Sequence, residues 1–390
     1  MRARWFSVWN WHYRGMDPLP VPPSSERLRY IDALRGIAAL LVVWLHAAGT
    51  FAMTSPETAA TSGAFGAIPG FIDVGHIGVV VFFLISGFVI PFSILPDRAA
   101  PVGSFVIKRI LRIYPAYWLS VPLAACVVFW LWGTEFTARE VLVNLTLMQD
   151  IFGVRSAEGV YWTLLVELVF YALCVVLLVT GSLFNTRRVA ILAAALGLAF
   201  VVIAAKFWLK RQFITTSAPY WFLNLSVMLC GALFRSRWNG TKRDTVADAL
   251  LAAMVALYVV VLPVAALLAS GPKNNEPATY AIGFLIFLAG TRLVRIETKV
   301  TDWLGRISYS IYLFHVIVFL AIEWWLLHRQ PVGSTWRTQH IGVYSVVGLA
   351  ATLAVASIVY RFVEKPGIRL GHRLAERWQQ RRGDRAETRV

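Results

Sequence analysis

The chain has 390 residues, of which 58% are hydrophobic and only 15% are charged. Soluble globular proteins carry about 25% charged residues, so this composition excludes an ordinary soluble domain and indicates a membrane protein. The formal net charge is +16, but most Lys and Arg residues fall in short segments between apolar runs. This placement favours a membrane surface as the partner of the positive charge and excludes nucleic acid.

The apolar runs predict an all-α fold, a polytopic membrane helix bundle of about ten transmembrane helices. Each run is about long enough to cross a hydrocarbon core of ~30 Å at ~1.5 Å per residue. Lys and Arg gather on one set of alternate segments, so the positive-inside rule places both termini in the cytoplasm. The expected location is the inner (cytoplasmic) membrane. The expected spans are 36–53, 76–95, 114–132, 160–180, 188–207, 219–234, 246–269, 278–291, 308–327 and 341–360.

Three segments are expected along the chain. Residues 1–28 form a flexible leader without the apolar core of a secretory signal peptide. Residues 29–365 form the transmembrane domain, and 366–390 form a basic cytoplasmic tail that we expect to lie on anionic lipid. The three cysteines fall within predicted spans and form no CxxC pair, so neither a disulfide framework nor a metal site is predicted.

The first span carries two residues that a plain lipid anchor would not have, Arg35 at its mouth and His46 in its middle. They are eleven positions apart, which is close to three helical turns, so both side chains share one face about 16 Å apart along the axis. An ionisable imidazole inside a membrane is costly unless it faces protein or water, which favours a functional role. The alternative is a histidine that is simply hydrogen-bonded inside the bundle.

Arg109 and Arg112 precede the third span and lie three residues apart, so they share a helix face. Guanidinium groups bind phosphate in a bidentate manner, and such a pair suits a phosphate-bearing ligand. The alternative is the ordinary excess of basic residues in cytoplasmic loops.

Three further polar residues lie within predicted spans. Glu167 is about 10 Å below the outer interface, where a carboxylate normally has an imidazole or arginine partner. His315 lies about one and a half turns from the cytoplasmic side of the ninth span, and either a packing hydrogen bond or a direct role is open. Ser86 with Gly87 near the middle of the second span indicates either close helix packing or a polar lining.

Together these residues provide a general base, a carboxylate to orient it and a cationic entry for an anionic donor. Histidine titrates near neutrality and takes a proton from a hydroxyl, which suits acyl or phosphoryl transfer. The sequence contains no GxSxG elbow, P-loop or HExxH motif. Phe51 stands where an HxxxxD motif starting at His46 would require aspartate.

Five motifs in order make the sequence similar to the acyltransferase-3 family of integral membrane acyltransferases. They span residues 29–365 and are IDALRGIAALLVVWLH at 31–46, FFLISGF at 82–88, Arg-x-x-Arg at 109–112, WTLLVE at 162–167 and ISYSIYLFH at 307–315. Each motif is weak alone, but five in the same order are specific.

The resemblance implies roles for individual residues. His46 would be the catalytic histidine, with Arg35 as its partner on the same helix. Arg109 and Arg112 would contact the phosphates of coenzyme A, and Glu167 would support the site. Asp32, Ser86 and His315 also match the family motifs, without a settled role.

The resemblance further implies that acetyl-CoA or another acyl-CoA is the donor co-substrate, with no permanently bound cofactor. The expected acceptor is a hydroxyl of an exported or surface glycan such as an exopolysaccharide, or of a lipid-linked sugar, and glycan-assembly proteins are expected partners. Some family members carry an SGNH domain after the last span, and none is expected here.

Several alternatives stay open at this stage. His46 either deprotonates the acceptor directly, or an acyl group is first held covalently and then passed on. An acyltransferase that modifies lipid or protein is a second interpretation. A third is a proton-coupled secondary transporter with His46 and Glu167 as its proton relay.

Overall fold

The computed structural model describes residues 28–54, 72–94, 100–209, 218–240, 243–270 and 276–387. Within these ranges the regular structure is entirely helical, which confirms the predicted all-α class. Most of the predicted leader, residues 1–27, lies outside the described residues.

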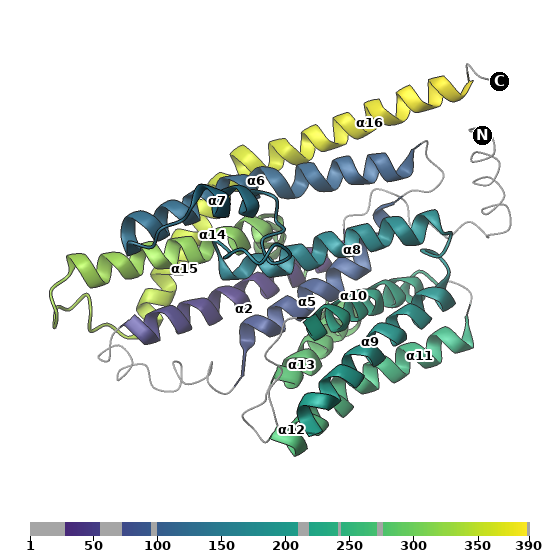
Figure 1. Cartoon of the computed structure of the whole chain (residues 1–390), viewed down its shortest axis with the longest axis horizontal. Helices are drawn as coiled ribbons and strands as arrows, with labels where there is room; N and C mark the ends of the chain where they lie inside the picture. Colours follow the sequence, from purple (N-terminus) through teal and green to yellow (C-terminus); the bar gives the residue numbers. More distant parts are fainter. Residues whose placement is uncertain are drawn as a thin grey trace. The chain divides into compact units, whose positions relative to one another are not determined.

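The helices follow one another along the chain as labelled in Figure 1. Their bounds are α2 (Arg29–Thr54), α5 (Val74–Val89), η1 (Pro91–Ser93), α6 (Pro101–Trp132), α7 (Ala138–Leu145), η2 (Gly159–Tyr161), α8 (Trp162–Val179), α9 (Thr186–Leu209), α10 (Ala218–Trp238), α11 (Thr245–Ala256), η3 (Leu257–Val261), α12 (Leu262–Ser270), α13 (Glu276–Leu288), η5 (Ala289–Leu293), α14 (Lys299–Arg329), α15 (Ile341–Val359), η6 (Tyr360–Glu364) and α16 (Lys365–Glu387).

Each of the ten predicted spans coincides with a helix, and eight helices in the described part of the chain are long and apolar enough to cross a membrane. The two ranges that differ are those of α10 and α13. Helix α10 contains Asn224 and ends with Arg235 and Arg237, so its apolar run is interrupted. Helix α13 has only 13 residues and begins with Glu276. The multi-pass bundle is therefore established with eight candidate spans.

The described chain divides into two compact units. One comprises residues 83–92 and 166–271, in which α9, α10 and α11 pack together. Gly87 on α5 contacts α10 so closely that a Cβ there would overlap the carbonyl of Met228. Of the two alternatives predicted for Ser86 and Gly87, close helix packing is observed at the glycine.

The other unit comprises residues 29–82, 93–165 and 272–390, and its centre is the pair α2 and α14. The two helices run parallel, because their contacts follow in the same order along both: Arg29 with Asp302, Asp32 with Gly305, His46 with His315 and Phe51 with Phe319. Gly305 makes this close approach possible, since a Cβ there would overlap the main-chain oxygen of Asp32.

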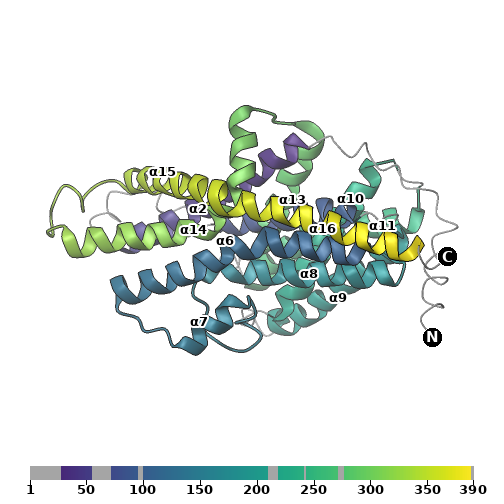
Figure 2. The ribbon, with the colours of Figure 1, turned by 90° about the horizontal axis from the view of Figure 1, so that it is seen from above.

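Helix α16 continues α15 through the π-helical segment η6, so the predicted tail boundary falls within one continuous helix. Figures 1 and 2 both show α16 lying along α6. The contact is made by small residues, because Gly367 packs on the main-chain oxygen of Leu111 and Gly371 on its Cβ. Contact of this helix with anionic lipid stays a prediction.

Candidate active site

His46 on α2 and His315 on α14 face each other in the middle of the parallel helix pair. The Nδ1 atom of His46 lies 3.3 Å from Nε2 of His315, and the ring centroids are 4.9 Å apart at an angle of 71°. His315 is fully buried, whereas His46 is half-buried. The structure thus brings together two histidines that are 269 residues apart in the sequence.

The hydrogen bonds of this pair fix the tautomer of each ring. His315 Nδ1 lies 2.8 Å from the carbonyl oxygen of Tyr312 and 3.2 Å from that of Ile311, and a carbonyl can only accept, so Nδ1 carries the proton. In neutral His315, Nε2 is then an acceptor, and His46 Nδ1–H donates to it and to the Val42 oxygen at 2.9 Å. The lone pair of His46 is therefore on Nε2, which has no hydrogen-bond partner among the described residues.

A second hydrogen-bonded group fixes α14 beside the first turn of α8. The hydroxyl of Tyr312 lies 2.7 Å from the Thr163 hydroxyl and donates to the Val160 oxygen at 3.0 Å. Thr163 belongs to the WTLLVE motif and Tyr312 to the ISYSIYLFH motif, so this contact joins two of the sequence motifs directly. Tyr312 also packs against His315, with ring centroids 6.0 Å apart.

Arg35 and Asp32 lie in the first turns of α2, on the same helix as His46 and about three turns below it. Both are half-buried. The main chain of Asp32 is the surface on which Gly305 packs. The predicted roles of the two side chains remain predictions.

Glu364 is a buried carboxylate near Arg35 that is not among the residues predicted from the sequence. It ends the π-helical segment η6, is 1% exposed, and accepts a hydrogen bond of 2.7 Å from the Ser310 hydroxyl. Arg112 and Arg35 both lie within electrostatic range of its carboxylate. A buried carboxylate requires such compensation, so Glu364 joins α14, α6 and α2 at the end of the pair where Arg35 lies. An acidic residue five positions after the end of a 19-residue apolar helix was the available signal.

Arg109 and Arg112, predicted to act as one fork, have different neighbours. Arg109 donates to the Ser93 hydroxyl at 2.5 Å and lies over the Phe105 ring at 5.2 Å. Arg112 instead lies within electrostatic range of Glu364. Phosphate binding by the two residues remains a prediction, and Arg112 is the one that shares surroundings with Arg35.

Glu167 and Ser86 belong to the other compact unit. The carboxylate of Glu167 accepts a hydrogen bond from the Tyr171 hydroxyl, one helical turn further along α8. This bond satisfies part of its hydrogen-bonding capacity within a single helix. The predicted pairing of Glu167 with an imidazole or an arginine, and the role of Ser86, stay predictions.

In the described ranges, no group of three or more His, Cys, Asp or Glu residues could hold a metal ion. Coenzyme A would be a substrate and not a resident group.

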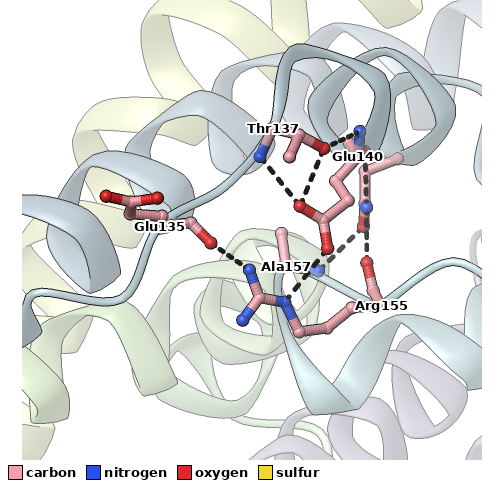
Figure 3. A network of polar contacts seen from close by, with 6 residues as sticks. Glu135, Thr137, Glu140, Arg155 and Ala157 are labelled. Atoms are coloured by element: carbon pink, nitrogen blue, oxygen red, sulfur yellow. Dashed lines mark hydrogen bonds and ion pairs between the residues drawn. The ribbon is translucent and has the colours of Figure 1, made fainter.

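The segment between α6 and α8 is fixed by a polar network, shown in Figure 3. Thr137 and Glu140 form a capping box at the start of α7. Arg155 forms an ion pair with Glu140 at 3.4 Å, donates a hydrogen bond to the main-chain oxygen of Glu135 and lies over the ring of Phe136. The loop leading to α8 is therefore held in one conformation by its own side chains.

Glu158, at the end of this loop, is 3% exposed, and burial raises its pKa from 4.5 to about 8. Between pH 4.5 and about 8 the folded protein keeps a proton that the unfolded chain has already lost. The free energy of unfolding therefore falls as the pH rises through this window. We expect Glu158→Gln to unfold at a higher temperature than the unchanged protein at pH 8, with the two converging towards pH 4.5. Thermal unfolding of the detergent-solubilised protein at several pH values measures this difference.

Glu140 provides the control with the opposite sign. Hydrogen bonds from Thr137 lower its pKa, so its contribution is present above the ordinary carboxylate pKa and is lost as the pH falls through its folded value. Glu140→Gln should therefore lose stability relative to the unchanged protein at neutral pH. Equal pH profiles for the Glu158→Gln variant and the unchanged protein would contradict the burial effect.

Comparison with known proteins agrees with the family resemblance of the five sequence motifs. A family model described as an acyltransferase domain matches residues 28–361, which is most of the chain. The matched range contains both histidines and all five sequence motifs.

Three curated relatives are similar over most of this chain. Nodulation protein 10 of Rhizobium leguminosarum bv. viciae is 26% identical over 77% of this chain and 84% of its own length. Acyltransferase MdmB of Streptomyces mycarofaciens is 26% identical over 90% of this chain and 94% of its own. Peptidoglycan O-acetyltransferase OatA of Listeria monocytogenes is 22% identical over 88% of this chain, which spans only 56% of OatA. No solved structure matches the chain.

Proposed function

Because this chain belongs to the acyltransferase-3 family and is a membrane-bound acyltransferase, we propose that it moves an acetyl or other short acyl group from acyl-CoA to a hydroxyl of an exported or surface glycan. The donor would be bound on the cytoplasmic side of the inner membrane, where we place both termini. A sugar acceptor is supported by the similarity to OatA, whose name states that it acetylates peptidoglycan.

One observation carries the proposal: the hydrogen bonds of the His46–His315 pair leave the lone pair of His46 on Nε2. Nε2 is then the atom that takes the proton of the acceptor hydroxyl. His315 accepts from the opposite nitrogen and so stabilises the imidazolium that forms when His46 takes that proton. Glu167 was expected to orient His46 in this way, and we assign that role to the neutral imidazole of His315.

The reaction balances without a further co-reactant. The acceptor oxygen gives its proton to His46 Nε2 and forms a bond to the acyl carbonyl carbon. The C–S bond of the thioester then breaks, and the thiolate of coenzyme A leaves and takes up the proton from His46. Transfer by way of a covalent acyl group on His46 uses the same atom as nucleophile instead of base.

Donor binding is proposed at the other end of the helix pair. Arg35 and Arg112 lie within electrostatic range of the buried Glu364 there, whose negative charge would offset the repulsion between the two guanidinium groups. The phosphates of coenzyme A would bind to this cationic end together with Arg109. The acyl thioester would then extend along α2 towards His46, about 16 Å away by helix geometry.

The test is acyl-CoA turnover in membranes that contain the protein. We expect release of free coenzyme A above the background of membranes without it, and an increase when a glycan acceptor is added. Arg112→Met should raise the KM for acyl-CoA about tenfold, because one charge-assisted phosphate contact is worth ~1.5 kcal/mol. A secondary transporter would leave free coenzyme A at background, and that outcome would refute the acyltransferase mechanism.

A further inference from the structure

A cluster of polar and aromatic side chains lies around the first turn of α5, at the level of His46 on α2 and about three helical turns from Arg35. The Oδ1 atom of Asp73 accepts a hydrogen bond of 2.7 Å from the main-chain N–H of His76. The Nε2 atom of His76 lies 3.2 Å from the hydroxyl of Tyr280 on α13. The rings of Tyr280 and Trp162 flank the imidazole, with centroids 5.2 and 6.2 Å away.

Two close helix contacts place this cluster at the level of His46. A Cβ on Gly75 would lie 2.6 Å from a methyl carbon of Leu45, the residue directly before His46. Gly78, one turn further along α5, packs on Ala38 and Val42 of α2. The two helices are thus antiparallel and in close register. Asp73 precedes Gly75 by two residues and lies within electrostatic range of His46.

Helix α13 is held against α5 in the same way, so Tyr280 is not free to move away from His76. Gly283 on α13 packs on Val80, where a Cβ would come within 2.6 Å of a valine methyl. Tyr280 itself is 1% exposed. His76 and Trp162 are half-buried, which leaves part of each accessible.

The cluster keeps hydrogen-bonding capacity that the protein does not use. His76 uses Nε2 towards Tyr280, and in the described residues its Nδ1 has no hydrogen-bond partner. Asp73 accepts a hydrogen bond only at Oδ1, and its Oδ2 has no hydrogen-bond partner among the described residues. Carboxylate and imidazole atoms beside aromatic rings suit a ligand with many hydroxyls, because the rings cover its C–H faces while the polar atoms bind its O–H groups.

We propose that Asp73, His76, Tyr280 and Trp162, here called the acceptor cluster, bind the sugar acceptor and present one hydroxyl to His46. This inference rests on the proposed function and adds to it the position of the acceptor. Donor and acceptor then approach His46 from opposite ends of α2. The acceptor cluster lies at the end predicted to face outward.

Asp73 also has a structural role as a helix cap, and a variant that keeps the cap separates this role from acceptor binding. Asp73 caps the N-terminus of α5, and asparagine caps a helix about as well as aspartate. Asp73→Asn therefore keeps the cap while it removes the carboxylate. Asp244 is the matched control, since it caps α11 through hydrogen bonds to the main-chain N–H groups of Val246 and Ala247.

The experiment measures acetyl-CoA turnover by the purified full-length protein with cellotetraose and with chitotetraose as acceptor probes. We expect Asp73→Asn and His76→Gln each to raise the KM for the accepted probe about tenfold, as for loss of a hydrogen bond to a substrate hydroxyl. The KM for acetyl-CoA should change less than twofold in both. Asp244→Asn should leave both KM values unchanged.

Three results would overturn the acceptor cluster. One is an unchanged probe KM in both variants, and another is an equal rise in both KM values, which a packing defect would produce. The third is the lack of saturable use of either probe by the unchanged protein. The proposed function is judged independently, by whether the unchanged protein releases coenzyme A and whether that release depends on His46.

Discussion

His46→Gln is expected to lower the rate of acyl transfer by about 10²–10⁴-fold, the range that a positioned general base contributes. Glutamine has nearly the size of histidine and can still donate to His315 and Val42, but it has no nitrogen lone pair that could take up a proton. The loss should therefore fall on kcat, with the KM for acyl-CoA nearly unchanged. Release of free coenzyme A from membranes containing equal amounts of each variant measures it.

His328→Gln is the matched control for this prediction. His328 lies on the same helix, α14, and stacks on Trp324 with ring centroids 5.1 Å apart, thirteen residues beyond His315. Turnover by this variant should equal that of the unchanged protein. If His46→Gln retains full turnover, His46 is neither base nor acyl carrier, and both mechanisms are wrong.

Gly305→Ala is expected to destabilise the folded protein by more than ~1–3 kcal/mol, the usual cost of overpacking a core. The added Cβ would overlap the main-chain oxygen of Asp32, and a backbone atom cannot move aside as a flexible side chain does. Helices α2 and α14 would have to separate, which would also pull His46 away from His315. Thermal unfolding of the detergent-purified protein and its acyl-CoA turnover should both decline.

Gly49→Ala provides the comparison on α2 itself. Apart from the backbone of α2 itself, no atom of the described residues lies within 4 Å of a Cβ built at Gly49, and alanine favours a helix over glycine by ~1 kcal/mol. This variant should be as stable as the unchanged protein or slightly more so. Equal stability of the two alanine variants would show that the α2–α14 contact does not limit folding.

Much of the bundle follows from hydropathy alone. Every predicted span coincides with a helix because backbone hydrogen bonds cannot be left unsatisfied in hydrocarbon. The spacing of Arg35 and His46 likewise places both on one helix face. The identity of the partner of His46 did not follow, since it depends on which helices pack together. In the sequence Glu167 was the expected orienting group, and His315 had either a packing hydrogen bond or a direct role. The parallel packing of α2 on α14 brings His315 to His46.

The burial of Glu364 and the neighbours of Arg109 and Arg112 on α6 could not be predicted from the sequence. Glu364 directly precedes a basic segment whose composition is typical of an exposed helix. Its burial depends on the docking of α16 on α6 through Gly367 and Gly371, a contact that no local pattern specifies. Arg109 and Arg112 share a helix face in sequence, yet they acquire different neighbours because two different segments pack beside them.

The parallel direction of α2 and α14 also constrains α10 and α13, the helices of the two predicted spans that are not long and apolar enough to count as candidate spans. Two parallel membrane helices must be separated by an odd number of crossings. Between α2 and α14 the described residues contain five candidate spans, namely α5, α6, α8, α9 and the α11–α12 helix. That number stays odd only if α10 and α13 both cross the membrane or both do not. A topology reporter fused after α10 would therefore also determine whether α13 crosses.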